Sequence, residues 1–307
     1  MQMQALHAVD KITVKANGKV NLTLDIQGRR ADGYHLLRSV MQSISLTDTV
    51  TLVRKPQGQG ISLRCDLPYL PQDEGNLCWR AAKAFQDKLG LKDLALDIDL
   101  RKEIPVGSGL GGGSTDAAAV LYGLNILYRG GLSLAELQTI GETIGADVPF
   151  CLQGGTCLVE GIGEQVTPIR PFPNFTMALV RPDVPVSTAE VYRRLDKASY
   201  GGNSTWRLLD YLSDQTDESL DQILANALES VTLDLVPEVR LWQERLLEWG
   251  AMASRMSGSG PTVFGLFAQE QEAMDFQARF QREAQVFIVH LPEQGVYVPE
   301  ANGGDQL

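Results

Sequence analysis

The alternation of apolar and polar residues over the first hundred positions predicts a set of strands. Apolar and β-branched residues recur at every second position, which is typical of half-buried strands. The expected strands are residues 11–26, 36–46, 48–53, 61–65 and 94–100. Residues 76–89 break this pattern, because Leu77 and Phe85 recur at helical spacing. This part of the chain is therefore expected to be mostly sheet, with one helix.

The pattern becomes helical after residue 113. Residues 114–128 predict a helix, and Ser133 with Glu136 has the spacing of a capping box that starts another. Residues 145–155 are expected to be a loop, and residues 156–169 a hairpin.

A proline-rich stretch at residues 170–175 precedes a new series of elements. These are a strand at 176–180, a second capping box at Ser187 and Glu190, three helical stretches up to residue 249, a glycine turn with a strand in 255–267, and a last helix and strand ending at 291. Separate runs of strands and helices favour an α+β fold. We expect two domains, at residues 1–165 and 166–307.

Five glycines crowd residues 107–113, between a predicted strand and a predicted helix. "GSGLGG" matches the dinucleotide pattern G-x-G-x-x-G, but that pattern needs a βαβ unit with an acidic residue about 20 positions later. Here the chain passes from one helix into another, and no Lys-Ser or Lys-Thr closes a Walker A loop. Glycines just before the start of a helix still allow the backbone to approach a phosphate, which the free N–H groups of the helix can bind. We therefore predict a phosphate cradle of another design, with a positive φ at Gly112.

Composition and charge limit the classes of ligand and partner that this protein is expected to bind. The net charge of −11 argues against a nucleic-acid partner. Residues 1–55 nevertheless hold eight Lys/Arg against four Asp, which favours a small anionic ligand. Three histidines make a His-based metal centre improbable, and four scattered cysteines are expected to be free thiols. Without a membrane-length apolar run or a secretory pattern, a cytoplasmic location with no membrane partner is expected.

Three motifs, in order along the chain, resemble the GHMP kinase family. They are "GKVNLTL" at residues 18–24, "PVGSGLGGGSTDAAA" at 105–119 and "RMSGSGPTVFGLF" at 255–267. The resemblance implies an N-terminal ATP-binding domain with a mixed sheet and helices, and a C-terminal α/β sandwich-like substrate domain. The chain departs from the family motifs in having Asn17-Gly18 for Pro-Ala and Thr115 for the second serine.

Two further stretches, "RRADGYH" at 29–35 and residues 145–164, are similar to the family members that act on a cytidine diphosphate-linked methylerythritol. The resemblance implies transfer of the ATP γ-phosphoryl group to the 2-hydroxyl of this small molecule, in the non-mevalonate isoprenoid pathway. Mg²⁺ is expected with the ATP phosphates. No residue is assigned as a metal ligand, and no oligomeric partner is predicted.

The resemblance places a carboxylate, Asp147, and a cation, Lys19, at the reacting centre. A carboxylate can take the proton that the acceptor hydroxyl loses. The lysine would keep Asp147 ionised and stabilise the charge that develops during phosphoryl transfer. Without the motifs, the two residues would be read as an ordinary surface ion pair.

The remaining predicted residues fall into two groups. The nucleotide group is Asn76, Pro105, Gly107, Gly109, Leu110, Gly111, Gly112, Gly113, Ser114 and Thr115. The substrate group is Asn21, Tyr34, His35, Thr188 and Tyr192. In the family, Tyr34 and Tyr192 would sandwich cytosine while His35 reads its polar edge. Asn76 either caps a helix or lies near adenine.

Two alternatives stay open. Another GHMP kinase, such as a homoserine or mevalonate kinase, would keep the glycine loop but would have no reason to carry "ADGYH". A non-catalytic nucleotide-binding module would keep the loop but would not need Lys19 and Asp147.

Overall fold

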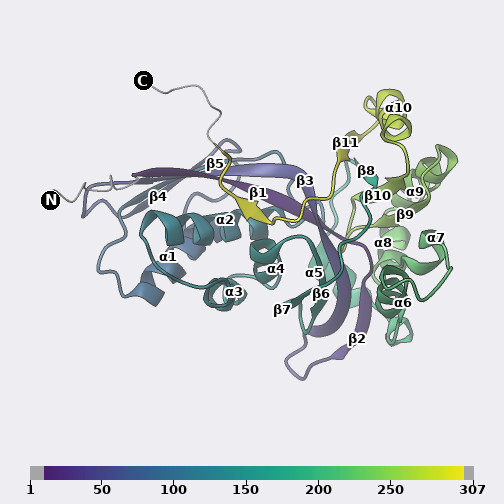
Figure 1. Cartoon of the computed structure of the whole chain (residues 1–307), viewed down its shortest axis with the longest axis horizontal. Coiled ribbons are helices and arrows are strands. Elements are labelled where there is room, and N and C mark those ends of the chain that lie inside the picture. The colour runs from purple at the N-terminus through teal and green to yellow at the C-terminus, as the bar shows by residue number, and fades with distance from the viewer. Residues whose placement is uncertain (1–9, 301–307) are drawn as a thin grey trace.

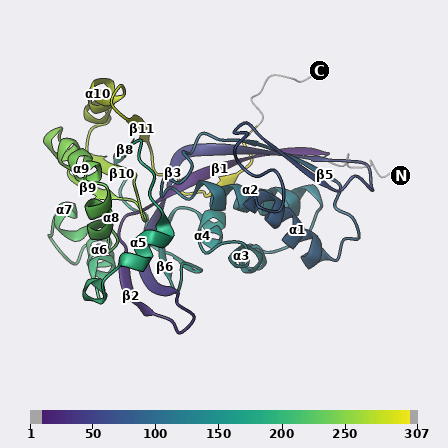
Figure 2. The same cartoon turned by 180° about the vertical axis from the view of Figure 1, so that it is seen from behind.

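The structure is a computed structural model that describes residues 10–300. It contains two β-sheets with helices packed on them (Figures 1 and 2). The larger sheet consists of β1 (Lys11–Asn21), β2 (Asp25–Arg29), β3 (His35–Arg54), β4 (Ile61–Cys65), β5 (Leu96–Arg101), β6 (Thr156–Glu160), β7 (Gln165–Pro168) and β12 (Val296–Tyr297). The smaller sheet consists of β8 (Thr176–Arg181), β9 (Ala253–Met256), β10 (Val263–Phe267) and β11 (Gln285–Val289).

The 20-residue strand β3 organises the larger sheet, because it pairs antiparallel with β1, β2, β5 and β6. Two predicted strands, 36–46 and 48–53, are thus one strand. The predicted strand 11–26 is instead two, β1 and β2. The chain separates them because the Leu24 N–H donates to the Ala225 carbonyl, which draws this stretch toward a distant segment.

Four helices cover one face of the larger sheet (Figure 1). They are α1 (Leu77–Leu89), α2 (Gly112–Leu127), α3 (Leu134–Glu142) and α4 (Val148–Gln153). Helix α2 lies closest to the sheet because its small residues allow a close approach: Ala117 is fully buried, and a Cβ at Gly123 would lie 2.7 Å from Leu52 Cδ1.

The prediction of a loop over residues 145–155 was wrong, since α4 occupies part of it. Val148 through Leu152 are all buried, and Pro149 stands in the first turn, where a missing N–H costs nothing. Such a short helix with apolar residues all round has no polar face, so its sequence carries no helical periodicity.

The strands of the smaller sheet are all antiparallel, in the order β11-β8-β10-β9. Seven helical elements accompany it. Five were predicted: the helix started by the second capping box, three further helical stretches and a last helix. The seven are α5 (Thr188–Arg194), η1 (Lys197–Ser199), α6 (Ser204–Leu212), α7 (Leu220–Ile223), α8 (Glu229–Leu235), α9 (Glu238–Glu248) and α10 (Glu270–Phe280).

One of the two predicted capping boxes is complete. Ser133 and Glu136 exchange both hydrogen bonds at the start of α3. At α5 the Ser187 hydroxyl accepts from the Glu190 N–H, but the Glu190 carboxylate is held by Arg193 and Arg194 and does not return the bond. The second capping box is incomplete because the two arginines, one turn away, bind the carboxylate that would otherwise cap the helix.

The chain returns to the larger sheet after the smaller one is complete, because β12 pairs with β1. The predicted boundary between residues 165 and 166 stays a prediction. All four cysteines are free thiols, as predicted. Between residues 10 and 300, no helix has both the length and the apolar character needed to cross a membrane.

Candidate active site

A cavity of about 740 Å³ contains almost every predicted site residue. Its wall is built by β1, the loop before α2, the loop before α4, helix α5 and the turn between β9 and β10. The exceptions are Leu110 and Thr115, which are fully buried. The Leu110 carbonyl accepts from the Lys19 N–H (2.9 Å), and the Thr115 hydroxyl donates to the Asn17 carbonyl (2.7 Å). These two residues thus support β1 beneath the cavity.

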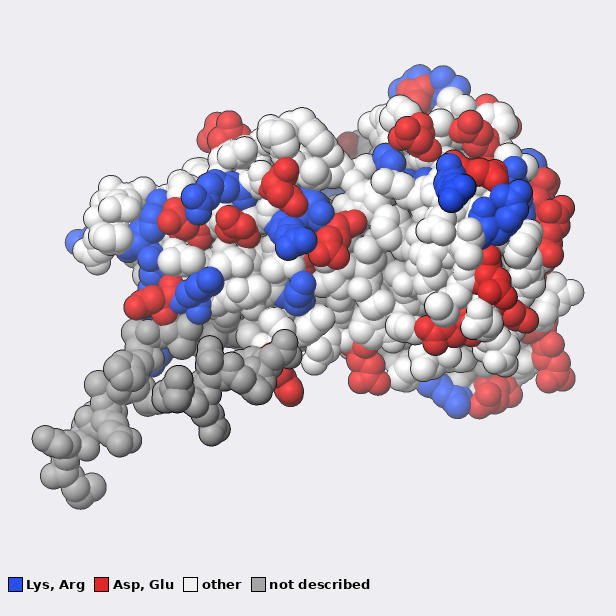
Figure 3. All heavy atoms as spheres, turned by 90° about the horizontal axis from the view of Figure 1, so that it is seen from above, with Lys and Arg blue, Asp and Glu red and all other residues white. Residues whose placement is uncertain are grey.

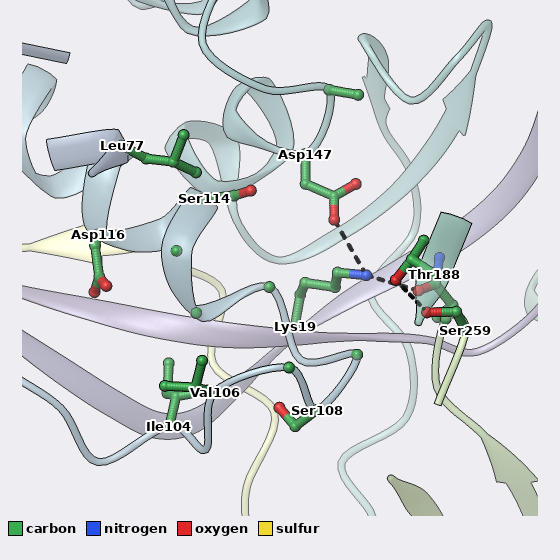
Figure 4. A pocket seen from close by; sticks show the side chains of 18 of the residues that line it. Lys19, Leu77, Ile104, Val106, Ser108, Ser114, Asp116, Asp147, Thr188 and Ser259 are labelled. Atoms are coloured by element: carbon green, nitrogen blue, oxygen red, sulfur yellow. Dashed lines mark hydrogen bonds and ion pairs between the residues drawn. The ribbon is translucent and has the colours of Figure 1, made fainter. Parts of the chain in front are cut away.

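Lys19 and Asp147 form an ion pair inside the cavity (Figure 4). Lys19 Nζ lies 3.3 Å from Asp147 Oδ2 and donates to Asn21 Oδ1 at 2.8 Å. The lysine side chain is 6% exposed and the aspartate side chain 31% exposed. Asp147 precedes the first residue of α4 but its carboxylate caps no N–H there. The carboxylate is therefore available to a molecule in the cavity, while the ammonium is held in place.

The strand that carries Lys19 is irregular where it meets the glycine loop. The register of β1 against β3 shifts between Asn17 and Gly18, one residue before the lysine. A Cβ at Gly111 would lie 2.8 Å from Lys19 Cγ, so the lysine stem passes directly over a residue that has no side chain. Such bulges commonly redirect a side chain next to an active site.

Asn17 stands where the family motif has proline. Each of its nitrogen and oxygen atoms makes a hydrogen bond. Its N–H donates to the Gly295 carbonyl and its amide nitrogen to the Gln294 carbonyl, both at 2.8 Å. Its two oxygens accept from the hydroxyls of Thr47 (2.8 Å) and Thr115 (2.7 Å). The bulge is thus tied to three other parts of the chain.

The glycine loop turns back on itself before α2. Positive φ angles occur at Gly107, Gly109 and Gly111, whereas Gly112 is the first residue of α2, so the prediction for Gly112 was wrong. A Cβ at Gly109 would lie 2.4 Å from the Ser257 carbonyl oxygen. Helix α2 has no side-chain cap on its first turn. Its free N–H groups and the helix dipole make this end suitable for a phosphate.

The turn between β9 and β10 packs on the glycine loop. The Ser257 hydroxyl donates to the Gly109 carbonyl at 3.1 Å and accepts from the Asn21 N–H at 3.2 Å. Ser259 shares a 2.7 Å hydrogen bond with Thr188, at the start of α5. The smaller sheet therefore contributes directly to the wall of the cavity.

A buried cluster of three ionisable side chains lies beside the glycine loop in the wall of the cavity. Lys102 Nζ contacts Asp48 Oδ2 and lies 2.5 Å from Asp116 Oδ2, and all three side chains are at most 4% exposed. Burial alone would lower the pKa of Lys102, but the two carboxylates raise it. Burial and the charge of Asp48 raise the pKa of Asp116 well above its usual range, even beside Lys102.

The same cluster joins both ends of the glycine loop. Asp48 Oδ1 accepts from the N–H groups of Glu103 (2.6 Å) and Ile104 (2.8 Å), just before the loop. Asp116 lies in α2, just after it. Lys102 therefore links the entry and the exit of the loop. Strand-end charges such as "RKE" are usually solvated, so the sequence carried no signal for this burial.

All five predicted substrate residues line the cavity, and two of them form a pair of rings. The rings of His35 and Tyr192 lie 5.2 Å apart at 33°, and Tyr200, which was not predicted, meets His35 edge-on at 5.9 Å. Tyr34 is 61% exposed. Burial, with a contribution from Arg29, lowers the pKa of His35, so the imidazole is neutral at pH 7. Burial likewise raises the pKa of Tyr192.

Asn76 caps a helix and lines the cavity at the same time. Its side chain accepts from the Cys78 N–H at 2.9 Å and donates to the Pro71 carbonyl at 2.8 Å. The capping role, one of the two alternatives, is therefore present. The other, a place near adenine, stays a prediction.

Few lysine and arginine side chains line the cavity. Of the eight Lys and Arg in residues 1–55, only Lys19 lines the cavity, and Lys102 is the other basic residue there. Both are paired with carboxylates. On the face in Figure 3, acidic and basic residues are interspersed. The N-terminal basic excess therefore does not make a basic pocket, and backbone N–H groups remain the main donors for an anion.

We expect Gly109→Ala to destabilise the protein more than Gly107→Ala. Both positions have positive φ, which costs about 1–2 kcal/mol for a residue with a Cβ. Only Gly109 would also meet a backbone oxygen, whereas no atom lies within 4 Å of a Cβ at Gly107. Overpacking adds about 1–3 kcal/mol. Urea denaturation measures the difference, and equal losses in the two variants would show that the contact with Ser257 can relax.

Comparisons with known proteins identify the family to which this chain belongs. Two family models match the chain, GHMP kinases N terminal domain over residues 76–155 and GHMP kinases C terminal over residues 208–285. A relative from Clostridium botulinum (strain Loch Maree / Type A3) is 44% identical over 254 residues, which is 82% of this chain and 90% of the relative. One from Acetivibrio thermocellus is 42% identical, covering 86% and 93%.

The chain therefore belongs to the GHMP kinase family, and it is a small-molecule kinase. Both relatives bear the name 4-diphosphocytidyl-2-C-methyl-D-erythritol kinase. A crystal structure of 4-(cytidine 5'-diphospho)-2C-methyl-D-erythritol kinase is 31% identical, with a TM-score of 0.77 over 91% of this chain and 99% of that one. A homoserine kinase from Cytophaga hutchinsonii also reaches 0.77, at 22% identity, and shares the fold. The predicted α+β, two-domain GHMP fold is confirmed.

Proposed function

We propose that this kinase transfers the γ-phosphoryl group of ATP to the 2-hydroxyl of 4-diphosphocytidyl-2-C-methyl-D-erythritol. The observation that carries the proposal is the position of the Lys19–Asp147 pair. It lies in one cavity with the glycine loop and with the ring pair of His35 and Tyr192. A nucleotide phosphate at the loop and a cytosine at the rings would thus have the reacting pair between them.

The proposed mechanism uses the pair directly. The 2-hydroxyl oxygen attacks the γ-phosphorus as the bond to the bridging oxygen of ADP breaks, and the hydroxyl proton passes to an Asp147 oxygen. Lys19 stabilises the negative charge on the oxygens being transferred. Phosphoryl transfer depends mainly on positioning. The two contacts that hold the buried ammonium, with Asn21 and Asp147, supply that positioning.

We assign the predicted residues to two subsites. ATP would contact Asn76, Pro105, Gly107, Gly109, Gly111, Gly112, Gly113 and Ser114, with Leu110 and Thr115 as support. The second substrate would contact Asn21, Tyr34, His35, Thr188 and Tyr192. A neutral imidazole offers one donor and one acceptor, which suits the polar edge of cytosine.

The cavity also contains donors that fit Mg²⁺. Within residues 10–300 no three His, Cys, Asp or Glu side chains cluster as a metal site of their own. However, Ser114 and Asp116 line the cavity, and Asp116 Oδ1 is buried without a partner among the described residues. Mg²⁺ is commonly held by one or two oxygen side chains together with substrate phosphates. Ser114 and Asp116 would hold the ion, which would neutralise phosphate charge when bound.

We also propose that the enzyme acts in the cytoplasm, on small molecules alone. Four free thiols agree with a reducing compartment. The experiment that tests the function is a steady-state assay with ATP and a panel of acceptors: the cytidine substrate, homoserine and mevalonate. Turnover of another acceptor would point to another GHMP kinase, and no turnover to a nucleotide-binding module.

CDP and CMP are expected to inhibit competitively against the cytidine substrate and not against ATP. Stacking of a base on aromatic side chains contributes about 1–3 kcal/mol. UMP should bind more weakly, because uracil inverts the donor and acceptor pattern of the base edge and leaves polar groups mismatched. Tyr34→Ala should weaken both bases, whereas His35→Ala should reduce only the preference for cytosine. Inhibition competitive with ATP alone, or equal binding of both bases, would contradict the assignment.

A further inference from the structure

Lys19 depends on the orientation of one amide. The Asn21 side chain is 2% exposed, and its Oδ1 accepts from Lys19 Nζ at 2.8 Å. An ammonium group can only donate hydrogen bonds. Were the amide reversed, its NH₂ group would face the ammonium, and two donors would meet in a buried place. Something must therefore hold the oxygen of Asn21 toward Lys19.

Ser39, on β3, is the neighbour that can do this. It is fully buried, and its hydroxyl lies 2.5 Å from the Thr23 carbonyl oxygen and 2.9 Å from Asn21 Nδ2. A hydroxyl has one proton, and a carbonyl oxygen can only accept. The Ser39 proton must therefore point at Thr23, which leaves the Ser39 oxygen able only to accept from Asn21. The NH₂ group of the amide then faces Ser39 and its oxygen faces Lys19.

We propose that Ser39 is a positioning residue for phosphoryl transfer, which orients the Asn21 amide and through it the Lys19 ammonium. The chain of polar groups runs from the Thr23 carbonyl through Ser39 and Asn21 to Lys19, and each donor in it has one acceptor. Buried polar networks of this kind specify one arrangement when every member is satisfied. Ser39 lines no part of the cavity, so it acts only through Asn21.

The test is a double-mutant cycle, with kcat measured for the ATP-dependent reaction. In the wild-type background, Ser39→Ala should lower kcat about tenfold, the size of one hydrogen bond in a buried network. The KM for ATP should change less than about twofold, because the glycine loop is untouched. Ser39→Thr keeps the hydroxyl and should retain most of the activity.

The Asn21→Asp background distinguishes orientation from packing. Both oxygens of an aspartate accept, so one of them faces Lys19 in either orientation. The other would meet the Ser39 oxygen, which can only accept while its proton points at Thr23. In this background Ser39 therefore gives no useful orientation, and Ser39→Ala should not lower kcat further. Ser43→Ala is the matched control, since Ser43 is a second buried serine of β3, bonded to the Gly155 N–H. It should cost stability without lowering kcat.

The same tenfold loss in both backgrounds, or an unchanged kcat in Ser39→Ala, would overturn the proposal. The role of Ser39 rests on the proposed function, but different results would refute each of them. A wild-type enzyme that does not turn over the cytidine substrate refutes the proposed function. A wild-type enzyme that turns it over, with an unaffected Ser39→Ala variant, refutes only the role of Ser39.

Discussion

Asp147→Asn and Lys19→Ala are each expected to lower kcat by about 10²-fold or more, the usual effect of losing a positioned acid–base or electrostatic group. The asparagine has the shape of the aspartate but cannot take the proton of the acceptor hydroxyl. The alanine removes the ammonium that would stabilise the charge on the transferred group. Nucleotide affinity should change little, because the glycine loop and the start of α2 would hold the phosphates through backbone N–H groups.

The combined variant should be no more than a few-fold slower than the slower single variant, because groups that act as a unit are not additive. Lys83 and Asp87 supply a matched control, since they form an exposed lysine–aspartate pair on α1 with a 2.8 Å separation. Lys83→Ala and Asp87→Asn should leave kcat unchanged. Rapid-quench measurement of single turnovers separates the chemical step from product release. A near-normal rate in either site variant would remove that residue from the mechanism.

Lys102→Met is expected to lower the free energy of unfolding by about 3–5 kcal/mol, the usual cost of removing one partner from a buried charge cluster. Methionine matches the length of the lysine stem, so the change removes charge with little change in volume. It would leave Asp48 and Asp116 facing each other, with side chains 0% and 4% exposed. Because Lys102 links the two ends of the glycine loop, ATP binding should weaken as well.

Lys55→Met is the control for this prediction. Lys55 Nζ lies 3.2 Å from Asp97, but the Asp97 side chain is 38% exposed. Such a pair is worth about 0–1 kcal/mol, because water still solvates the carboxylate. Urea denaturation and calorimetry with ATP measure both variants. A loss of less than about 1 kcal/mol in Lys102→Met would mean that the two carboxylates are neutralised in another way.

How much could be predicted from the sequence depended on the range of the interactions. The helix starts at Asn76 and Ser133 follow from side chains that bond N–H groups two or three residues away. The strand alternation and the glycine loop are equally local patterns. The sequence therefore predicted most elements, and all but two of the site residues that it predicted line the cavity.

The errors arose where distant segments decide the outcome. Strand β1 ends at Asn21 because Leu24 bonds to Ala225, about 200 residues away along the chain. Helix α4 forms from residues that are apolar all round and carry no helical period. Gly112 belongs to the helix and not to the left-handed turn, because the chain has already reversed at Gly111.

The sequence by itself determined the α+β class, and it led to the predictions of a phosphate cradle and of the pair Lys19 and Asp147. Only the tertiary structure decided how these groups are held. It buried Lys102 between two carboxylates and placed Ser39 behind Asn21. The physical reason is that burial and hydrogen-bond direction depend on which strands become neighbours. A polar residue in the sequence looks the same whether water or another side chain will satisfy it.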